Sequence, residues 1–431
     1  MINNKKIGLS LSGGGYRAAA FHLGTLKKLH HLGILEKIDV ISTISGGSIV
    51  GACYCLNKQH FSSFEKEMYE ALNKKSIIRY IVTSPVFICA LLGIAGYFLL
   101  LSWLTNFLSS WIILPGVLLF VFITSRYQFR VLPLSSLVEK AYNKYFFKNA
   151  VLNSLKESPL LVIGTTNLQT FRPFTFSKTK MSDSTYSYLE KPIIFSQENF
   201  PLAKAVAAST CVPNFFTPIR IPVKYFKDAA QAISANPVLV DGGIYDNQGI
   251  HKLTQEGSTY YCDVIITSDA GNKPSFEKKY SNTLTLLTRT IDAFMARIKH
   301  FQMMQTIYSK GSEKRVAYIS LAWELDRLVS GFYAGMKSGL IKKTVLDKHR
   351  IPGEWLADVA SNKDNIISHM NGRINYDQII KNKLTDTEHL AATSIKTNLT
   401  TLSVEQLDAI IKLAGNLTEA QIRLYCPDII E

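Results

Sequence analysis

The sequence predicts an α/β fold with a mainly parallel central sheet, into which an apolar helical segment is inserted. Over residues 1–75, short apolar strands alternate with helices, an order typical of parallel sheets. Strands are predicted at residues 6–11 and 38–43, and each is followed by glycines and a helix of small residues. The insertion is marked by residues 80–125, which contain no charged residue and no histidine. At 431 residues, the chain is long enough for one large domain or two smaller ones.

A serine stands at the turn between the second strand and its helix. Ser45 lies between Ile44 and the glycines Gly46 and Gly47, and a small-residue helix is predicted from there to Ala52. A sharp strand-to-helix turn exposes a serine hydroxyl, and the N-terminus of the helix favours a developing negative charge. A serine that only caps a helix has the same sequence pattern. Ser45 is therefore a candidate nucleophile and equally a candidate cap.

The first strand ends in three consecutive glycines. Gly13, Gly14 and Gly15 can turn backbone amides inward without obstruction by side chains. Acyl transfer needs such donors where a carbonyl oxygen becomes negative, and we expect the amide of Gly46 to join them. Arg17 opens the next helix, where it is positioned to neutralise a phosphate or to lock the loop.

The same glycine run also fits a dinucleotide-binding fingerprint, G-x-G-x-x-G/A, after a strand. That interpretation requires an acidic residue at the end of the second strand. The second strand ends in Ser42 and Thr43, and Asp39 lies inside it. Dinucleotide binding is therefore the weaker interpretation.

A third motif places a carboxylate on a glycine turn, at Asp241-Gly242-Gly243 after an apolar strand. With glycine loop, serine turn and Asp-Gly-Gly in this order, the chain resembles the patatin-like phospholipases over about residues 5–270, apart from the insertion. The resemblance implies a three-layer patatin-like fold and a lipid acyl hydrolase that needs no cofactor or metal. It also implies that Ser45 is the nucleophile and Asp241 its partner in a dyad without a catalytic histidine. A carboxylate at hydrogen-bond distance can accept the serine proton during acyl transfer.

Two further segments, residues 164–170 and 207–216, resemble family segments that pack beneath the active site. One position departs from the family pattern, because Thr43 stands where a glycine is usual, two residues before the nucleophile. A β-branched residue suits the strand but crowds the turn. The alternative is therefore a catalytically inactive, membrane-anchored binding or scaffold protein.

Other residues compete for the role of the base. Asp269 ranks second to Asp241, because it ends the apolar strand at residues 264–266. No histidine lies in a recognisable catalytic setting. The weaker candidates are Asp246, Asp263, His22, His251 and His389.

The uncharged run divides into two apolar segments, Ile81–Leu104 and Trp111–Thr124, separated by a more polar break. A bilayer core needs about 20 apolar helical residues, which the first segment supplies and the second approaches. Because Ser45 precedes the run and Asp241 follows it, one shared site requires an even number of crossings. We therefore expect a hairpin with the catalytic body on the cytoplasmic side, because both ends of the run carry basic flanks: Lys74, Lys75, Arg79, Arg126 and Arg130. The alternatives are a buried helix pair, a dimer interface and a re-entrant loop.

The net charge of +15 beside an apolar hairpin indicates attraction to anionic lipid. The sequence has no zinc-ligand spacing, RNP-like aromatic pair or dense basic helix to indicate nucleic-acid binding. The expected partners are a lipid substrate and the bilayer. A homo-oligomer and a small-molecule activator are compatible with the sequence, although no residue identifies a trigger site. Six scattered cysteines fit a reducing compartment, and a first strand that starts near the N-terminus predicts no signal peptide.

The expected domain organisation has four parts. Residues 1–75 and 131–320 form the catalytic domain, 76–130 the hairpin and 321–431 a mainly helical C-terminal region. Within these parts, an amphipathic helix is predicted over residues 275–310 and a strand over 316–321. Ser403 and Gln406 form a capping-box pattern at the start of a later helix.

Overall fold

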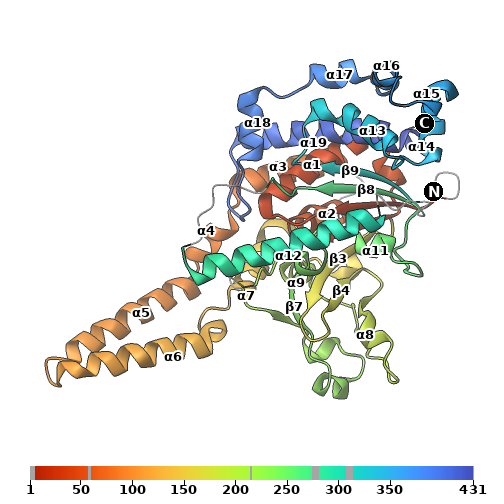
Figure 1. The fold of residues 1–431 in the computed structure, drawn as a ribbon. Helices are drawn as coiled ribbons and strands as arrows, with labels where there is room; N and C mark the ends of the chain where they lie inside the picture. Colours follow the sequence, from red (N-terminus) through yellow and green to blue (C-terminus); the bar gives the residue numbers. More distant parts are fainter. Residues whose placement is uncertain (1–4, 57–59, 214–215, 274–280, 307–313, 431) are drawn as a thin grey trace.

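The computed structural model describes residues 5–56, 60–213, 216–273, 281–306 and 314–430 (Figure 1). Its centre is a nine-stranded mixed sheet in the order β5-β4-β3-β2-β1-β8-β9, with β7 paired to β3 and β6 paired to β7. The parallel part consists of β1 (Ile7–Leu11), β2 (Val40–Ile44), β3 (Leu160–Asn167), β8 (Val264–Asp269) and β9 (Arg315–Ser320). The antiparallel part consists of β4 (Arg172–Phe176), β5 (Met181–Asp183), β6 (Ile219–Arg220) and β7 (Val238–Asp241). The predicted α/β class with a mainly parallel centre is confirmed.

Helices surround this sheet, and those near the C-terminus gather on one side of it, at the top of Figure 1. The long helix α19 (Val404–Tyr425) packs along α1 (Gly15–His31), which follows the glycine run. An ion pair of 2.8 Å between Lys28 and Glu419 joins the two helices. The last helix of the chain therefore lies against the first. The remaining helices of the body are α2 (Gly46–Leu56), α3 (Phe61–Lys74), α7 (Leu134–Tyr142), α8 (Ser184–Ser187), α9 (Leu202–Ser209), α10 (Gly243–Asp246), α11 (His251–Thr254), α12 (Thr283–Thr306), α13 (Leu328–Lys337), α14 (Lys343–His349), α15 (Gly353–Ala357), α16 (Lys363–Ile374), α17 (Tyr376–Lys381) and α18 (Asp386–Thr393).

Several local predictions are confirmed by these elements. The strands predicted at residues 6–11, 38–43 and 316–321 correspond to β1, β2 and β9. The amphipathic helix predicted over 275–310 is α12, and the ends of that prediction lie outside the described residues. The capping box at α19 is present, since Ser403 and Gln406 exchange two hydrogen bonds of 3.1 Å between side chain and backbone.

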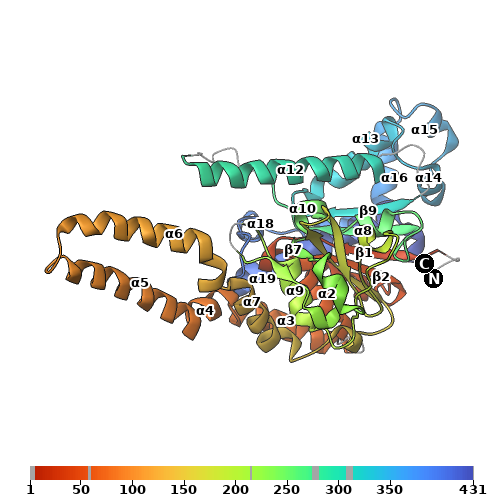
Figure 2. The same cartoon turned by 90° about the horizontal axis from the view of Figure 1, so that it is seen from below.

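The apolar insertion forms a helical hairpin that projects from the body (Figures 1 and 2). It consists of α5 (Pro85–Leu104) and α6 (Ile113–Val131), and the short helix α4 (Ile77–Val82) precedes it. The two long helices approach closely at Gly116, where an added Cβ would lie 2.6 Å from the Leu101 side chain. The Tyr97 hydroxyl also donates to the Gly116 carbonyl over 2.6 Å.

Both predicted boundaries of the hairpin need correction. The first long helix begins at Pro85, because Ile81 belongs to α4 and is buried against the body. The second helix continues past Thr124 to Val131 and includes Arg126 and Arg130, because charged residues can extend a helix beyond its apolar part. Both helices are long and apolar enough to cross a membrane. In the most apolar 18-residue stretch of each helix, 6% of α5 and none of α6 is buried. The core of this chain therefore does not enclose the two helices.

Candidate active site

Strand β3 brings the two predicted catalytic residues to one point. The first half of β3 pairs with β2, and Ile44, the residue before Ser45, lies opposite Gly164. The second half pairs with β7, which runs the other way, and Asp241 lies opposite Thr165. Strands β2 and β7 therefore point toward each other along the same side of β3, and their ends meet at two consecutive residues.

Ser45 occupies a strained turn between β2 and α2. Its φ angle is 49°, in the left-handed region that side chains other than glycine rarely adopt. Its backbone N–H donates to the Ser209 hydroxyl over 2.9 Å, and Ser209 in turn donates to the Gly164 carbonyl over 2.7 Å. Strained backbone held by such contacts is typical of functional turns. A strained strand-to-helix turn that carries a serine is the geometry expected of a nucleophile elbow.

Asp241 lies against this serine. Burial raises the pKa of its carboxyl to about 6, against the opposing effects of hydrogen bonds from the Gly243 amide and the Ser45 hydroxyl. The Gly243 amide donates to Asp241 Oδ1 over 2.7 Å, which fixes the carboxylate at the turn. A carboxylate with a pKa near 6 is a stronger base than an exposed aspartate and is still mostly ionised at pH 7.

The glycine loop approaches the serine turn too closely for side chains. A Cβ on Gly46 would lie 2.1 Å from the Gly15 carbonyl oxygen, and one on Gly15 would lie 2.3 Å from the Asn398 carbonyl oxygen. Within the described part of the chain, the amides of Gly14, Gly15 and Gly46 have no hydrogen-bond acceptor. These three amides are therefore available as oxyanion donors.

Gly13 differs from the other three predicted donors. Its amide already donates to the Asn247 carbonyl over 2.9 Å. Gly13 instead allows Asn247 and Ser45 to lie close to the loop, because an added Cβ would lie 2.4 Å from Asn247 Oδ1 and 3.3 Å from Ser45 Cβ.

Arg17 lies beneath the loop and is nearly buried. Its Nη1 donates to the Ile395 carbonyl over 3.3 Å, and its Nη2 lies 3.4 Å from the Cβ position of Gly14. Burial lowers the pKa of the guanidinium, partly offset by the charge of Asp269. These contacts favour a role in supporting the loop, although Nε is buried without a hydrogen-bond partner.

Thr43, the departure from the family pattern, fits its position. Its hydroxyl donates to the Val162 carbonyl over 3.2 Å and accepts from the Ser48 hydroxyl over 3.1 Å. The space for its methyl group comes from Gly51, where an added Cβ would lie 2.6 Å from Thr43 Cγ2. A glycine on the following helix therefore compensates for the extra side chain on the strand.

The competing carboxylates are engaged elsewhere. Asp269 forms an ion pair with Lys299 and accepts a 2.7 Å hydrogen bond from the Tyr318 hydroxyl. Burial raises its pKa, but these partners and the Gly271 amide outweigh burial and lower it. Asp246 caps the turn after α10 by accepting from the backbone amides of residues 248, 249 and 251. Asp263 accepts from the Lys6 amide at the other end of β8.

No histidine forms a hydrogen bond with Ser45 in the described part of the chain. His22 bonds to the Ser12 carbonyl over 2.9 Å and to the Ser268 hydroxyl over 2.8 Å. Burial lowers its pKa to about 4, so it is a neutral residue that joins the glycine loop to β8. His251 is likewise kept neutral by burial, with a pKa of about 4. His389 lies on α18 and lines a pocket with Glu324 and Leu413.

Sequence reasoning missed the residues that brace the site from a distance. Ser209 lies in one of the two segments singled out, but its bonds to Ser45 and Gly164 could not be predicted from sequence. Asn398 accepts from the Tyr16 amide over 2.8 Å and fills the space beside Gly15. No local pattern marks Asn398, since the contact joins opposite ends of the chain.

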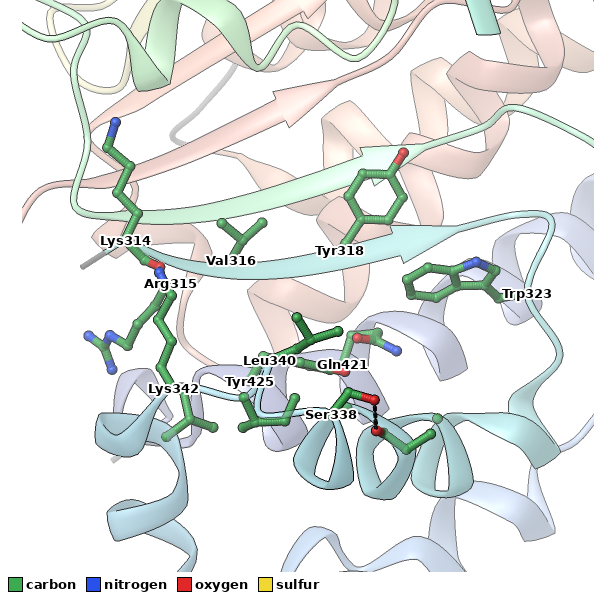
Figure 3. Close-up of a pocket in the computed structure, with 15 residues that line it drawn as sticks. Lys314, Arg315, Val316, Tyr318, Trp323, Ser338, Leu340, Lys342, Gln421 and Tyr425 are labelled. Carbon is green, nitrogen blue, oxygen red and sulfur yellow. Dashed lines mark hydrogen bonds between the residues drawn. The ribbon is translucent and has the colours of Figure 1, made fainter. Parts of the chain in front are cut away.

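A separate cavity lies away from this site. It measures about 320 Å³ and is bounded by β9, α13 and α19, at the far edge of the parallel strands (Figure 3). Tyr318 and Trp323 line it, and Tyr318 also reaches Asp269 through its hydroxyl. No group of three or more potential metal ligands occurs in the residues that the structure describes.

Comparison with known protein families identifies the class to which this chain belongs. The patatin-like phospholipase family model matches residues 9–254, more than half of the chain, and the chain therefore belongs to the patatin-like phospholipase family. No curated protein matches at a significant level.

Solved structures give more distant matches. Human GIVD cytosolic phospholipase A2 is 15% identical with a TM-score of 0.44, and the match covers 97% of this chain and 59% of the human one. VipD from Legionella pneumophila is 14% identical with a TM-score of 0.31, and the match covers 90% of this chain and 82% of VipD.

Proposed function

We propose that this protein is a membrane-associated serine acyl hydrolase that cleaves phospholipid or related lipid esters with a Ser45–Asp241 dyad. The observation that carries the proposal is the pairing along β3, which sets Ile44 and Asp241 beside consecutive residues. That pairing is non-local, and it joins a strained serine to a carboxylate whose raised pKa suits a base. Family membership supports the same reaction class.

The reaction proceeds in two halves. The Ser45 oxygen attacks the ester carbonyl carbon while its proton passes to Asp241, and the oxyanion is held by the amides of Gly14, Gly15 and Gly46. When the intermediate collapses, the ester C–O bond breaks and Asp241 returns the proton to the departing alcohol. Water then attacks the acyl-serine, and its proton again passes to Asp241. The carboxylic acid leaves, and the proton returns to Ser45.

The hairpin would hold this site at its substrate. Twenty residues of α5 span about 30 Å at about 1.5 Å per residue, close to the thickness of a bilayer core. Arg126 and Arg130 lie in the half of α6 that joins the body, and Lys74, Lys75 and Arg79 lie at the other junction. We infer that the hairpin embeds with the basic junctions and the body on the cytoplasmic side.

Two alternatives are less well supported. The scaffold alternative rested on Thr43, and Gly51 provides the space that Thr43 needs. The dinucleotide alternative needs open space at the glycine loop, and the carbonyl groups of Asn398 and Asn247 already occupy its surroundings.

Lipid mass spectrometry of cells that express the wild type or Ser45→Ala tests the proposal. We expect loss of a phospholipid class with release of fatty acid in the wild type only. In parallel, a fluorophosphonate probe should label the wild type and the control Ser62→Ala, whose side chain is exposed on α3, but not Ser45→Ala. Labelling that persists in Ser45→Ala would refute the assignment of the nucleophile.

A further inference from the structure

Helix α12 packs over the candidate site with one face. It contacts α10, the short helix that directly follows Asp241. Met295 Cε lies 3.2 Å from the Cβ position of Gly243, whose amide holds the Asp241 carboxylate. Lys299 pairs with Asp269, and Gln302 donates a hydrogen bond to Asp246. Residues 295, 299 and 302 share one face of a helix, so this inner face fastens α12 to three points around the site.

The outer face of α12 is apolar and open to solvent. Its large side chains are 53–63% exposed and include three that repeat every seven residues: Leu287, Phe294 and Phe301, together with Leu286 and Met304. Large apolar side chains gathered on an exposed face mark a contact surface. The inner face already packs on the body, whereas the outer face is left open by the described residues and can bind a partner.

A lipid surface fits this outer face best. Figures 1 and 2 show that α12 extends from the body toward the same side as the α5–α6 hairpin. The helix carries three basic residues and one acidic residue, and Arg297 is exposed between Phe294 and Phe301. Aromatic residues beside arginine on one face of a helix are typical of helices that lie in the interface of anionic membranes.

The candidate site next to this helix is nearly closed to solvent. Ser45 is 6% exposed and Asp241 is 7% exposed. The ester of a lipid must nevertheless reach the Ser45 oxygen. Met295 packs against Gly243, two residues after Asp241, and Lys299 pairs with Asp269 at the end of β8. A ligand shifts an equilibrium only toward the state that it binds more tightly. A lipid interface would favour a position of α12 away from the site if that position buries more of the apolar outer face in the lipid.

We propose that α12 is a cover over the Ser45–Asp241 site whose apolar outer face binds an anionic lipid surface and thereby opens the site. This inference rests on the proposed function, because it assigns to that site the lipid surface as its activator.

The test uses the full-length protein in liposomes that contain phosphatidylglycerol and in liposomes of phosphatidylcholine alone, with two substrates measured in each. One substrate is phospholipid in the bilayer, and the other is a water-soluble short-chain ester. With phosphatidylglycerol, Phe294→Ser combined with Phe301→Ser should lower bilayer hydrolysis at least tenfold and abolish the rise in soluble-ester hydrolysis that this lipid causes in the wild type. In phosphatidylcholine alone, the same variant should hydrolyse the soluble ester within twofold of the wild type. The control Leu390→Ser, at an exposed apolar residue of α18, should change neither. Met295→Ala should raise hydrolysis of the soluble ester severalfold, because it weakens the inner contact.

A direct measurement separates α12 from the chemistry. Cys89 is the exposed cysteine and the other five are buried, so Leu287→Cys in a Cys89→Ser background allows a polarity-sensitive dye to be attached to the outer face. The dye emission should shift to the blue when the liposomes contain phosphatidylglycerol but not when they contain phosphatidylcholine alone. An unchanged dye spectrum would overturn the proposal, and so would a Phe294/Phe301 variant that loses soluble-ester hydrolysis to the same extent with and without phosphatidylglycerol. A shift that grows with protein concentration in detergent without these lipids would also overturn it, since it would identify a second copy as the occupant. A lipid-dependent shift in a protein that hydrolyses neither substrate would support lipid binding by α12 and refute the hydrolase.

Discussion

Glycines serve opposite purposes in the serine turn and in the hairpin. At Gly46 and Gly15, an added Cβ would lie 2.1 and 2.3 Å from carbonyl oxygens of other segments. At Gly93 and Gly96 in α5, an added Cβ would meet nothing within 4 Å. The glycines of the turn are therefore required by contacts inside the protein, whereas those of α5 face outward. The difference indicates that the surroundings of α5 lie outside the chain and that those of the serine turn are complete within it.

The largest effect is expected at Gly46. Gly46→Ala should abolish hydrolysis of a soluble ester, because the methyl group would displace the Gly15 carbonyl and with it the candidate donors. The matched control is Gly96→Ala, which should retain activity and gain up to about 1 kcal/mol of helix stability. Ester turnover and thermal unfolding measured on both variants check this prediction. Comparable activity in the two variants would remove the contrast between the regions.

A loss of about 10²–10⁴ in turnover is expected for Asp241→Asn, which keeps the shape of the side chain but removes the proton acceptor. Steady-state kinetics should show this loss in kcat, with the fold preserved by circular dichroism. The matched control is Asp263→Asn, at the opposite end of β8, which should stay within a few-fold of the wild type. If Asp269→Asn proves inactive and Asp241→Asn active, the base has been assigned to the wrong strand.

These two regions also differ in how far the sequence predicts them. Strands β1 and β2, the serine turn and the apolar run are local patterns, so periodicity and composition are sufficient to find them. The meeting of β2 and β7 on β3 depends on antiparallel pairing between segments about 75 residues apart, which no local pattern specifies. The bracing of Gly15 by Asn398 is of the same kind. The predicted end of α6 is wrong for a different reason. The apolar stretch ends at Thr124, whereas the helix continues to Val131.

The pH dependence of turnover should report the environment of Asp241. Its pKa is raised from 3.8 to about 6, so the basic form is lost as pH falls through 6. We expect kcat/KM on a soluble ester to be level above pH 7 and to fall about tenfold per unit below pH 6. A group whose pKa is raised on folding binds more protons in the folded state, so its contribution to stability is present at low pH and is lost as pH rises from about 4 to 6. A loss of activity at pH 5 with unchanged circular dichroism would therefore be catalytic. If kcat/KM instead fell only as the pH approached 4, the base would be a carboxylate exposed to water.

The smallest effect is expected inside the hairpin, where Gly116 and Gly96 form a matched pair. Gly116→Ala would place a methyl group 2.6 Å from the end of the Leu101 side chain, a flexible group that can move, whereas Gly96→Ala meets open space. If α5 and α6 pack on each other within a bilayer, Gly116→Ala should loosen the pair by less than about 3 kcal/mol, and both variants should stay in the membrane after carbonate extraction. Extraction and the midpoint of thermal unfolding in micelles measure the two effects separately. Release of the wild type by carbonate would instead mean that the exposed faces of α5 and α6 are covered by another protein surface. In that case the contrast with the serine turn would describe an oligomer interface rather than a lipid environment.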